Sequence, residues 1–446
     1  MIYFYKKLNT IGKIGLIFFI FLNISFVFLL LSPYIPNLIG EYQDNLLLSH
    51  CNDRIQKYRT GNIKIKLQYL NGTPIPNYNL SYDLVKHEFY FGCNIFSFDS
   101  FYGADKTGYN ESYRTYFKKL FNFAVLPFYW REYEPVQNRF PTENWLNKTI
   151  DWCLKNNITM KGHPLVWSRY YGVPTWLPLE NDSLTLNLLH NRITKIVSKY
   201  KDKIQMWDVV NEPVHTHTFG HLSVQENILY PILWAKQANP NSFLTINDYG
   251  ILGHDFGNGP FYQLIFQLNK ENVNFDYIGL QAHEPRTDWI PATEIWNTLE
   301  SYSHLGKPIY ITEFTPISAP VPITNSWKKG LWSELNQAEY AQRFYLISFS
   351  HPSVKGIIWW DLTDLTSWLE GGGLLRSNMT PKPVYNTLDN LINKQWHTFG
   401  WKLTNSSGWI NFQGFFGTYN ISINNGTYNY QITSKSNSLN TFVITI

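Results

Sequence analysis

Two short apolar segments of this 446-residue chain end in side chains that can carry acid–base chemistry. The segment QMWDVVNEP stops at Asn211 and Glu212 before Pro213, which does not let a strand continue. The segment IYITEFT places Glu313 in the same relation to its own apolar run. An Asn-Glu-Pro turn alone is an ordinary strand terminator. A second apolar strand that ends in the same way, at Glu313, favours a function for both glutamates.

Two carboxylates at one site match what hydrolysis of a glycosidic bond needs. One carboxylic acid protonates the departing oxygen while the other carboxylate attacks the sugar carbon, with retention of configuration at a separation of about 5–5.5 Å. A carboxylate near a cation or donor stays charged, whereas one in apolar surroundings keeps its proton. The pair therefore predicts one proton donor and one nucleophile.

Two other chemistries are weaker alternatives. His163, Glu212, His283 and Glu313 are possible metal ligands, but no HExxH or other i, i+4 ligand pair lies near them. A serine nucleophile lacks the GxSxG turn that would present it. We therefore expect neither a metal nor a cofactor.

The elements that must position these residues repeat a rhythm of short apolar strand, polar loop and helical stretch. Eight such strands begin at residues 89, 122, 160, 205, 243, 277, 309 and 356. This count predicts an α/β fold, a closed (β/α)8 TIM barrel. An open doubly wound sheet is disfavoured because no glycine-rich phosphate loop follows the first strand.

Chemistry in such barrels sits at the carboxyl ends of the strands. Six of the eight predicted strands end in hydrogen-bonding or aromatic side chains: His163; Asn211 and Glu212; Asn247 and Asp248; Gln281 and His283; Glu313; Trp359 and Trp360. We expect them to converge on one mouth, with Trp359 directed into the core because it alternates with Trp360.

The flanking segments complete a four-part organisation. Residues 1–40 are predicted to be a cytoplasmic stub with a membrane anchor or signal, 41–88 a linker with a two-stranded antiparallel β module, 89–396 the catalytic barrel with a closing helix, and 397–446 a small β-rich C-terminal segment.

Residues 14–31 are almost wholly apolar and follow Lys6, Lys7 and Lys13, which predicts a membrane segment with its N-terminal side inside. No small-x-small cleavage signal follows, which favours an uncleaved transmembrane helix and an extracellular catalytic domain over a secreted protein. Asn-x-Ser/Thr sequons, weak support for export, occur at Asn71, Asn79, Asn110, Asn147, Asn157, Asn181, Asn378, Asn405, Asn420 and Asn425.

Composition excludes one class of partner. The net charge is only +4 and the basic residues form no stripe, so we expect no nucleic-acid binding. The 17% aromatic content suits both stacking on sugar rings and core packing. Cys51, Cys93 and Cys153 permit at most one disulfide, and a Cys51–Cys93 bridge is conceivable in an oxidising compartment.

Between about residues 55 and 396 the chain resembles glycoside hydrolase family 10, the retaining endo-β-1,4-xylanases. The motifs that carry the resemblance are GHPLVW at 162–167, WDVVNEP at 207–213, NDYG at 247–250, GLQAH at 279–283, ITEF at 311–314 and PKPVY at 381–385. Their number and order make the resemblance specific.

The resemblance implies that Glu212 is the general acid/base and Glu313 the nucleophile. It also implies that His163, Trp167 and Asn211 contact sugar, and that His283, with Gln281 nearby, keeps Glu313 ionised. Trp360 and Trp368 resemble the family's two cleft tryptophans, one a floor and one a lid.

Three departures from the family pattern are present, and the first two concern substrate choice. Pro127 and Phe128 stand where the family has a Glu-Asn pair that binds the next sugar, so Tyr129, Trp130 or Arg131 must build that subsite, with Arg131 a predicted substrate contact. Thr315 replaces an Asp two residues past the nucleophile, and Ser168 replaces a second His.

The sequence thus predicts a membrane-anchored retaining glycosidase whose partner is a β-1,4-linked polysaccharide, foremost xylan. An endo-β-glucanase or mannanase would differ only in the contacts away from the cleavage point. An inactive cell-surface glycan-binding protein is the alternative of another class, and the presence of both glutamates disfavours it.

Overall fold

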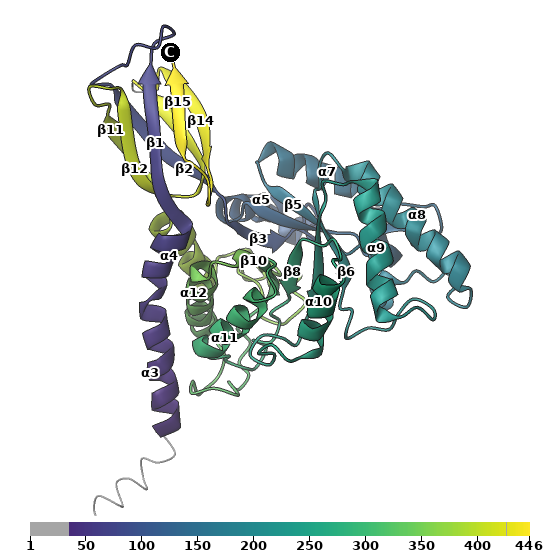
Figure 1. Cartoon of the computed structure of the whole chain (residues 1–446). Coiled ribbons are helices and arrows are strands. Elements are labelled where there is room, and N and C mark those ends of the chain that lie inside the picture. Colours follow the sequence, from purple (N-terminus) through teal and green to yellow (C-terminus); the bar gives the residue numbers. More distant parts are fainter. Residues whose placement is uncertain (1–34, 425) are drawn as a thin grey trace, which may run out of the picture.

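The computed structural model describes residues 35–424 and 426–446 (Figure 1). Its centre is a closed barrel of eight parallel strands in the order β10-β3-β4-β5-β6-β7-β8-β9, which confirms the predicted fold. The strands are β3 (Tyr90–Asn94), β4 (Phe123–Pro127), β5 (Thr159–His163), β6 (Met206–Asn211), β7 (Phe243–Asp248), β8 (Tyr277–Leu280), β9 (Ile309–Phe314) and β10 (Val354–Trp359).

Amphipathic helices surround the barrel and return the chain from each strand to the next. They are α5 (Tyr109–Leu120), α6 (Trp130–Tyr133), α7 (Glu143–Lys155), α8 (Asp182–Tyr200), α9 (Val224–Ala238), α10 (Pro260–Lys270), α11 (Ala292–Ser303), α12 (Glu334–Ser350) and α13 (Pro383–Asn390). Several begin at side-chain caps: Ser223 and Glu226 form a capping box on α9, and Ser333 caps α12.

The barrel interior is filled with large side chains and is not a pore. Phe123, Val125, Met206, Tyr310, Ile358 and Trp360 form its central cluster. Gly356 makes room for this filling, because a Cβ there would lie 2.8 Å from the Tyr310 ring. Trp359 alternates with Trp360 and is fully buried in the outer core, as predicted.

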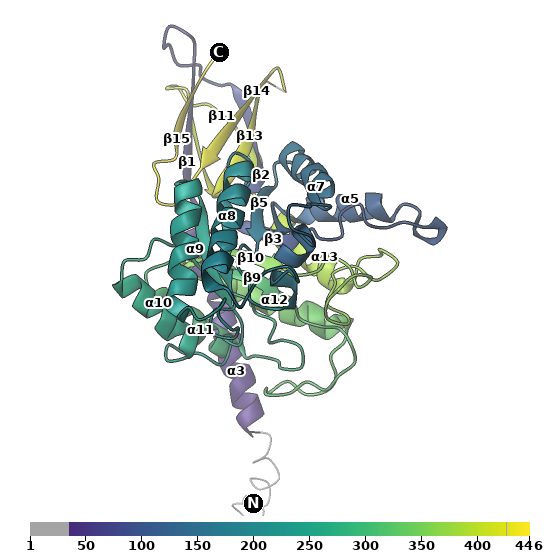
Figure 2. The same ribbon diagram turned by 90° about the vertical axis from the view of Figure 1, so that its right-hand side faces the viewer.

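Strands from both ends of the chain build one β module. A three-stranded sheet joins β1 (Thr60–Gln68) to β12 (Trp409–Phe415) and β15 (Thr441–Thr445). A four-stranded sheet, in the order β11-β2-β13-β14, joins β2 (Asn79–His87) to β11 (Phe399–Leu403), β13 (Gly417–Ile423) and β14 (Tyr428–Ser434). In Figures 1 and 2 this module stands at one end of the barrel.

The predicted pairing within residues 41–88 is therefore wrong. β1 and β2 belong to different sheets, and each takes its partners from the C-terminal segment instead. Alternation predicted both strands but not their partners, because the inward side chains of each strand pair equally well with any strand of matching pattern.

Residues 41–59, predicted as a linker, are helical. Helices α3 (Ile35–Ser49) and α4 (Cys51–Arg59) run along α11 and α12 (Figure 1). Asp44 fastens α3 by accepting hydrogen bonds from the Thr293 amide at 3.1 Å and the Trp327 indole at 2.8 Å. The Arg59 guanidinium at the end of α4 donates to three carbonyls around the start of β10.

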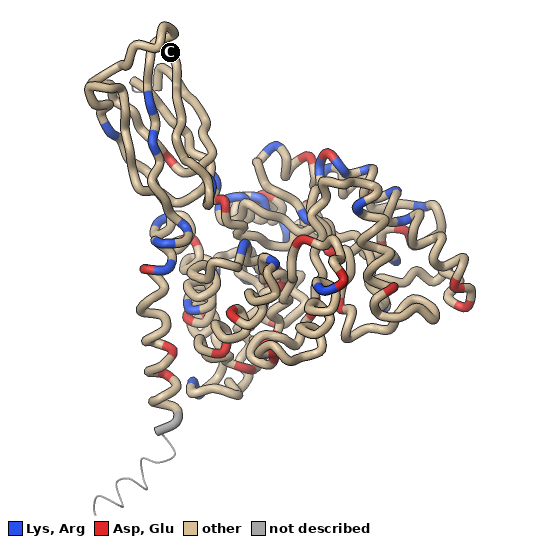
Figure 3. The backbone as a smooth tube through the Cα atoms, viewed as in Figure 1, with Lys and Arg blue, Asp and Glu red and all other residues tan. Residues whose placement is uncertain are grey.

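The predicted membrane segment at residues 14–31 lies outside the described residues. Within residues 35–424 and 426–446, no helix is both long and apolar enough to cross a bilayer. Acidic and basic residues are dispersed along the described chain, as the coloured backbone in Figure 3 shows. Cys51, Cys93 and Cys153 are buried free thiols, so the conceivable Cys51–Cys93 bridge is absent from this structure.

Candidate active site

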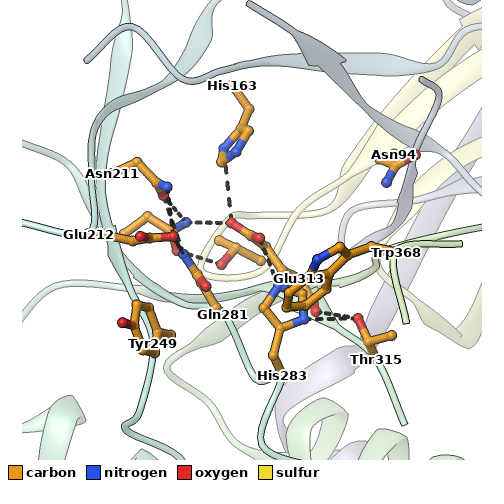
Figure 4. A network of polar contacts seen from close by, with 12 residues as sticks. Asn94, His163, Asn211, Glu212, Tyr249, Gln281, His283, Glu313, Thr315 and Trp368 are labelled. Carbon is orange, nitrogen blue, oxygen red and sulfur yellow. Dashed lines mark hydrogen bonds and ion pairs between the residues drawn. The ribbon is translucent and has the colours of Figure 1, made fainter. Parts of the chain in front are cut away.

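The carboxyl ends of β5 to β10 bring the predicted polar side chains together at one mouth of the barrel (Figure 4). Glu212 follows the last residue of β6, and Glu313 is the fifth residue of β9. Both side chains are almost fully enclosed, with 11% and 6% of their surfaces exposed. Burial of two carboxylates requires partners for both, because an isolated buried charge is costly.

Glu313 is surrounded by nitrogen donors. Its Oε1 accepts a hydrogen bond from Asn247 Nδ2 at 2.7 Å, and its Oε2 lies 3.0 Å from His283 Nε2. His163 Nδ1 is 4.0 Å from Oε1. Burial alone would raise the pKa of Glu313, but the attraction of His163 and the hydrogen bond from His283 lower that pKa below its usual value. Glu313 is thus held as a carboxylate.

A buried ion cluster beneath this site fixes His163. Asp208, on β6, lies 2.7 Å from His163 Nδ1 and 2.7 Å from Lys161 Nζ. Burial raises the pKa of Asp208, and Lys161 and His163 outweigh that effect, so the net shift is downward. An ionised Asp208 keeps His163 oriented toward the mouth.

Glu212 has a different set of neighbours. Its Oε1 accepts hydrogen bonds from Asn211 Nδ2 at 3.2 Å and Gln281 Nε2 at 3.1 Å, and its Oε2 accepts one from Trp167 Nε1 at 3.0 Å. The Arg169 Nε lies 3.7 Å from Oε2, on a side chain that is half exposed. Three of these four neighbours are uncharged, and the one cation stands on the solvent side.

The backbone at Glu212 adopts the left-handed conformation, with φ of 56°. A non-glycine residue reaches this region at a cost, and such residues cluster at functional sites. The Glu212 amide is held by the Asn247 carbonyl at 2.7 Å. This turn directs the carboxylate into the mouth at the point where Pro213 ends the strand.

Asn247, at the end of β7, joins the surroundings of the two glutamates. Its Nδ2 donates to Glu313 Oε1 and to Asn211 Oδ1, both at 2.7 Å, and its Oδ1 accepts a hydrogen bond from Thr312 at 2.6 Å. The sequence marked Asn247 as a polar strand end but did not make it a site residue. Its signal was the motif NDYG directly after an apolar strand.

Aromatic rings enclose the polar cluster. Trp360 makes edge contacts with His163 and His283, with ring centroids 5.3 and 5.9 Å apart. Trp368 lies 4.7 Å from His283 and is 55% exposed. Trp360 is therefore a buried floor and Trp368 an open rim, the positions from which rings can stack on a sugar.

Asp361 and Asn94 support this rim and were not singled out from the sequence. Asp361 accepts hydrogen bonds from the Trp368 amide at 2.9 Å and from Asn94 Nδ2 at 3.1 Å. Burial raises the pKa of Asp361 despite these donors. Thr315, a departure from the family pattern, lies 3.0 Å from His283 Nδ1 and so takes part in orienting that ring.

The residues expected after the second strand separate into two groups. The Tyr129 ring lies 5.4 Å from the His163 ring and 5.6 Å from the Trp167 ring, so it reaches the site. Trp130 is buried and donates to Glu134. Arg131, predicted to contact substrate, donates instead to the Val173 carbonyl and lies 3.8 Å from the centre of the Tyr170 ring.

The arrangement can therefore perform acid–base and nucleophilic chemistry on a polar substrate. It offers an ionised carboxylate, a second carboxyl group among uncharged donors, and amides that can bond hydroxyls. Within the described part of the chain, no three His, Cys, Asp or Glu side chains are grouped so that they could hold a metal ion.

Comparison with known proteins agrees with this geometry. Residues 83–391 match the model of the family described as glycosyl hydrolase family 10. The endo-1,4-beta-xylanase B of Thermotoga neapolitana is 30% identical over 302 residues, which cover 64% of this chain and 84% of that protein. The anti-sigma-I factor RsgI6 of Acetivibrio thermocellus is 26% identical over 414 residues, 91% of this chain. The chain spans only 50% of the length of that relative.

Solved structures show the same fold. Native xylanase 10B from Thermotoga maritima superposes with a TM-score of 0.57 at 27% identity, over 69% of this chain and 96% of that one. Xylanase 10B from Thermotoga petrophila, solved in complex with xylobiose, gives 0.55 at 26% identity, over 69% of this chain and 95% of that one. The family model covers well over half of this chain. The chain belongs to glycosyl hydrolase family 10.

Proposed function

We propose that this chain is a retaining endo-glycosidase that hydrolyses β-1,4-xylosidic bonds in xylan, with Glu313 as nucleophile and Glu212 as general acid/base. The observation that carries the proposal is the unequal surroundings of the two glutamates. Glu313 sits between two histidines and an amide donor, whereas Glu212 is bonded by amides and an indole. Membership of a family whose relatives are named xylanases supports the substrate class.

The first step forms a covalent glycosyl-enzyme. A Glu313 carboxylate oxygen donates an electron pair to the anomeric carbon, the glycosidic C–O bond breaks, and the Glu212 proton passes to the departing oxygen. In the second step Glu212 removes a proton from water, which attacks the same carbon and releases Glu313 as a carboxylate. Two inversions at one carbon retain its configuration.

The other site residues have roles that follow from their positions. Asn211, which lies between Glu212 and Asn247, offers an amide to the sugar 2-hydroxyl. His163 contacts the same sugar, and Gln281 orients Glu212 through its amide. Trp360 and Trp368 stack on sugar rings as floor and lid.

A glucan or mannan remains the alternative substrate, and the region after β4 is the reason. Pro127 and Phe128 occupy the place of the Glu-Asn pair expected from the family, and Phe128 is fully buried. Tyr129 is then the side chain that meets the next sugar, with a phenol in place of a carboxylate and an amide.

Product analysis tests the proposal. Purified protein is incubated with xylan, mixed-linkage glucan and mannan, and the products are sized and examined by proton NMR during the first turnovers. We expect a ladder of oligosaccharides from xylan with the β-anomer formed first. Release of oligosaccharides from glucan or mannan but not from xylan would overturn the assignment of xylan as substrate. First formation of the α-anomer would overturn the retaining mechanism.

A second candidate is a glycan-sensing surface protein, favoured by one observation: the alignment with a protein named an anti-sigma-I factor extends over 91% of this chain. In that role the apolar segment at residues 14–31 would anchor the barrel outside a membrane. Wild-type protein that binds β-glycans and hydrolyses none of them would favour this candidate. Loss of hydrolysis in Glu313→Ala with retained binding would favour the enzyme.

A further inference from the structure

One face of the β module combines exposed apolar side chains with uncharged polar ones. The four-stranded sheet turns Leu80, Tyr82 and Leu84 of β2 inward, where the Tyr82 ring stacks on Phe412 of the other sheet at 3.7 Å. The alternate residues therefore point outward. We call this surface the outer face; its members are Asn79, Ser81, Asp83, Phe399, Trp401, Leu403, Thr418, Asn420, Ser422, Asn429, Gln431 and Thr433.

Strand register arranges these residues in rows across the sheet. Trp401, Ser81, Ser422 and Asn429 are successive partners on the four strands and form one row. Phe399, Asp83, Asn420 and Gln431 form the next row. Each row thus begins with an aromatic ring on edge strand β11 and continues in hydroxyl, amide or carboxylate groups.

The aromatic edge is well exposed. Phe399, Trp401 and Leu403 have 74%, 66% and 55% of their surfaces open to solvent. Phe399 and Trp401 are two residues apart on one strand, so their Cα atoms are about 7 Å apart, a spacing that lets two rings meet one extended ligand. Large apolar side chains gathered on one exposed surface indicate a binding function.

The polar part of the outer face is nearly uncharged. Its one ionisable member, Asp83, has a carboxylate oxygen 2.8 Å from His397 Nε2. Lys86, further along β2, donates to Asn157 and Thr159 of the barrel instead. Ser422 donates to Asn429 and Gln431 to Asn420, which holds the amides in fixed orientations. A ligand complementary to this face is neutral and rich in hydroxyls.

We propose that the outer face is a second glycan-binding site, which holds a neutral polysaccharide chain across β11, β2, β13 and β14. The Phe399 and Trp401 rings cover the apolar faces of sugar rings, and the amides and hydroxyls of the neighbouring rows bond sugar hydroxyls. A nucleic acid or acidic polymer is disfavoured, because the twelve positions hold no lysine or arginine.

The outer face is separate from the barrel mouth. β2 runs directly into β3, and a cavity between the module and the barrel is lined by residues at the starting ends of strands, among them Tyr90, Tyr277 and Tyr310. Glu212 and Glu313 lie at the opposite ends of their strands. Figure 1 shows the module standing away from the barrel. Occupation of the outer face therefore leaves the mouth open.

A second copy of this chain is the competing occupant, because an edge strand with exposed apolar side chains can pair with another edge. The polar rows argue against it. Beyond β11, the outer face offers hydroxyl and amide groups in place of the apolar core that a stable homodimer buries.

The experiment compares full-length Trp401→Ala with wild type for retention on insoluble xylan and on cellulose. Tyr69→Ala is the matched control, because Tyr69 is a half-exposed aromatic residue of the same module in the turn after β1. Protein is made in a host without N-glycosylation, since Asn79 and Asn420 lie on the outer face within sequons. Cleavage of a short soluble xylo-oligosaccharide reports separately on the barrel mouth.

We expect Trp401→Ala to weaken retention on at least one of the two polymers about tenfold, which corresponds to about 1.4 kcal/mol, with cleavage of the short substrate unchanged. Tyr69→Ala should behave as wild type in both assays. Equal retention of all three proteins would overturn the proposal. The proposal would also be overturned if sedimentation showed that wild type is a dimer and Trp401→Ala a monomer, while both proteins were retained equally on the polymers. Absence of cleavage with the retention difference present would refute the proposed catalytic activity alone.

Discussion

At the scale of single residues, Asn247 connects the two glutamates through hydrogen bonds. One amide group donates to Glu313 and to Asn211, and Asn211 in turn donates to Glu212. The proposed nucleophile and the proposed proton donor are therefore held by one hydrogen-bonded chain. A substitution at Asn247 removes the donor to Glu313 and to Asn211 while leaving both glutamates in the sequence.

Replacement of Asn247 by Ala should lower kcat/KM on xylan about 100-fold, the loss expected when a preorganised donor is removed from a buried active site. The exposed Asn241→Ala serves as control, because Asn241 lies in the turn before β7. Thermal unfolding of both variants tells a catalytic effect from misfolding. Near-normal activity in folded Asn247→Ala would show that Glu313 does not depend on this donor.

His283→Asn should move the acidic limb of the kcat/KM profile to higher pH. The hydrogen bond from His283 helps to lower the pKa of Glu313 against the effect of burial. Without it that pKa rises, and a smaller fraction of Glu313 is ionised at a given acidic pH. His221→Asn is the control, since His221 is exposed and bonds Asp182. An unmoved acidic limb would contradict the nucleophile assignment.

The lowered pKa of Glu313 also predicts how the free energy of unfolding depends on pH. Because the pKa of Glu313 is lowered in the folded protein, its contribution to stability is present above the unfolded value of about 4.5 and is lost as pH falls through the folded value. Wild type should therefore lose more stability than His283→Asn between pH 5 and the acid limit. Chemical unfolding at several pH values measures the difference, and equal losses would contradict it.

How far sequence predicts single residues depends on what each one touches. Glu212, Glu313, His163 and His283 were identified because strand ends of a barrel must converge. The orientation of Arg131 was not foreseen: on the short helix α6 its neighbour Trp130 is buried, and the Arg131 guanidinium donates to the Val173 carbonyl. No pattern within that segment specifies this orientation.

At the scale of elements, α8 fixes the loops that follow β4 and β5. The buried Arg192 guanidinium donates to the carbonyls of Phe128, Pro164 and Leu165. Burial lowers the pKa of Arg192 to about 9, against the opposing effect of Tyr133 and Glu134. These carbonyls adjoin Tyr129 and His163, so one helix positions two sides of the site.

Arg192→Met should lower the free energy of unfolding by about 2–4 kcal/mol, because three buried carbonyls lose their donor. It should also raise KM, since the loops that carry Tyr129 and His163 are no longer fixed. Arg139→Met, at an exposed position, should change stability by less than about 0.5 kcal/mol. Denaturant unfolding measures the free energy of unfolding, and steady-state kinetics measures KM. An unchanged KM would show that the contacts of α8 do not affect substrate binding.

At the scale of the whole molecule, strands that precede the barrel pair with strands that follow it. Removal of residues 397–446 should yield insoluble protein, because β1 and β2 lose every strand partner they have among the described residues, and their inward side chains become exposed. Val443→Ser, an exposed position on β15, should leave solubility and the melting temperature nearly unchanged. A soluble, active 1–396 chain would show that the barrel stands without the module.

At this scale the sequence predicted the barrel but not the strand pairing of the β module. The barrel follows from a local alternation of strands and helices, repeated in order along the chain. The β module depends on register between segments that lie at opposite ends of the sequence, such as Ile65 beside Phe442. Alternation predicts that such strands exist but does not identify their partners.

Because β1 pairs with β15, the three-stranded sheet can be completed only after β15 has been translated. β1 leaves the ribosome before the barrel, and its neighbour β15 is translated only after the barrel. While the residues of the barrel are being synthesised, β1 therefore has a free edge. A helper that shields β1 during this interval would raise the yield of native protein, and slow translation before β15 would lower it.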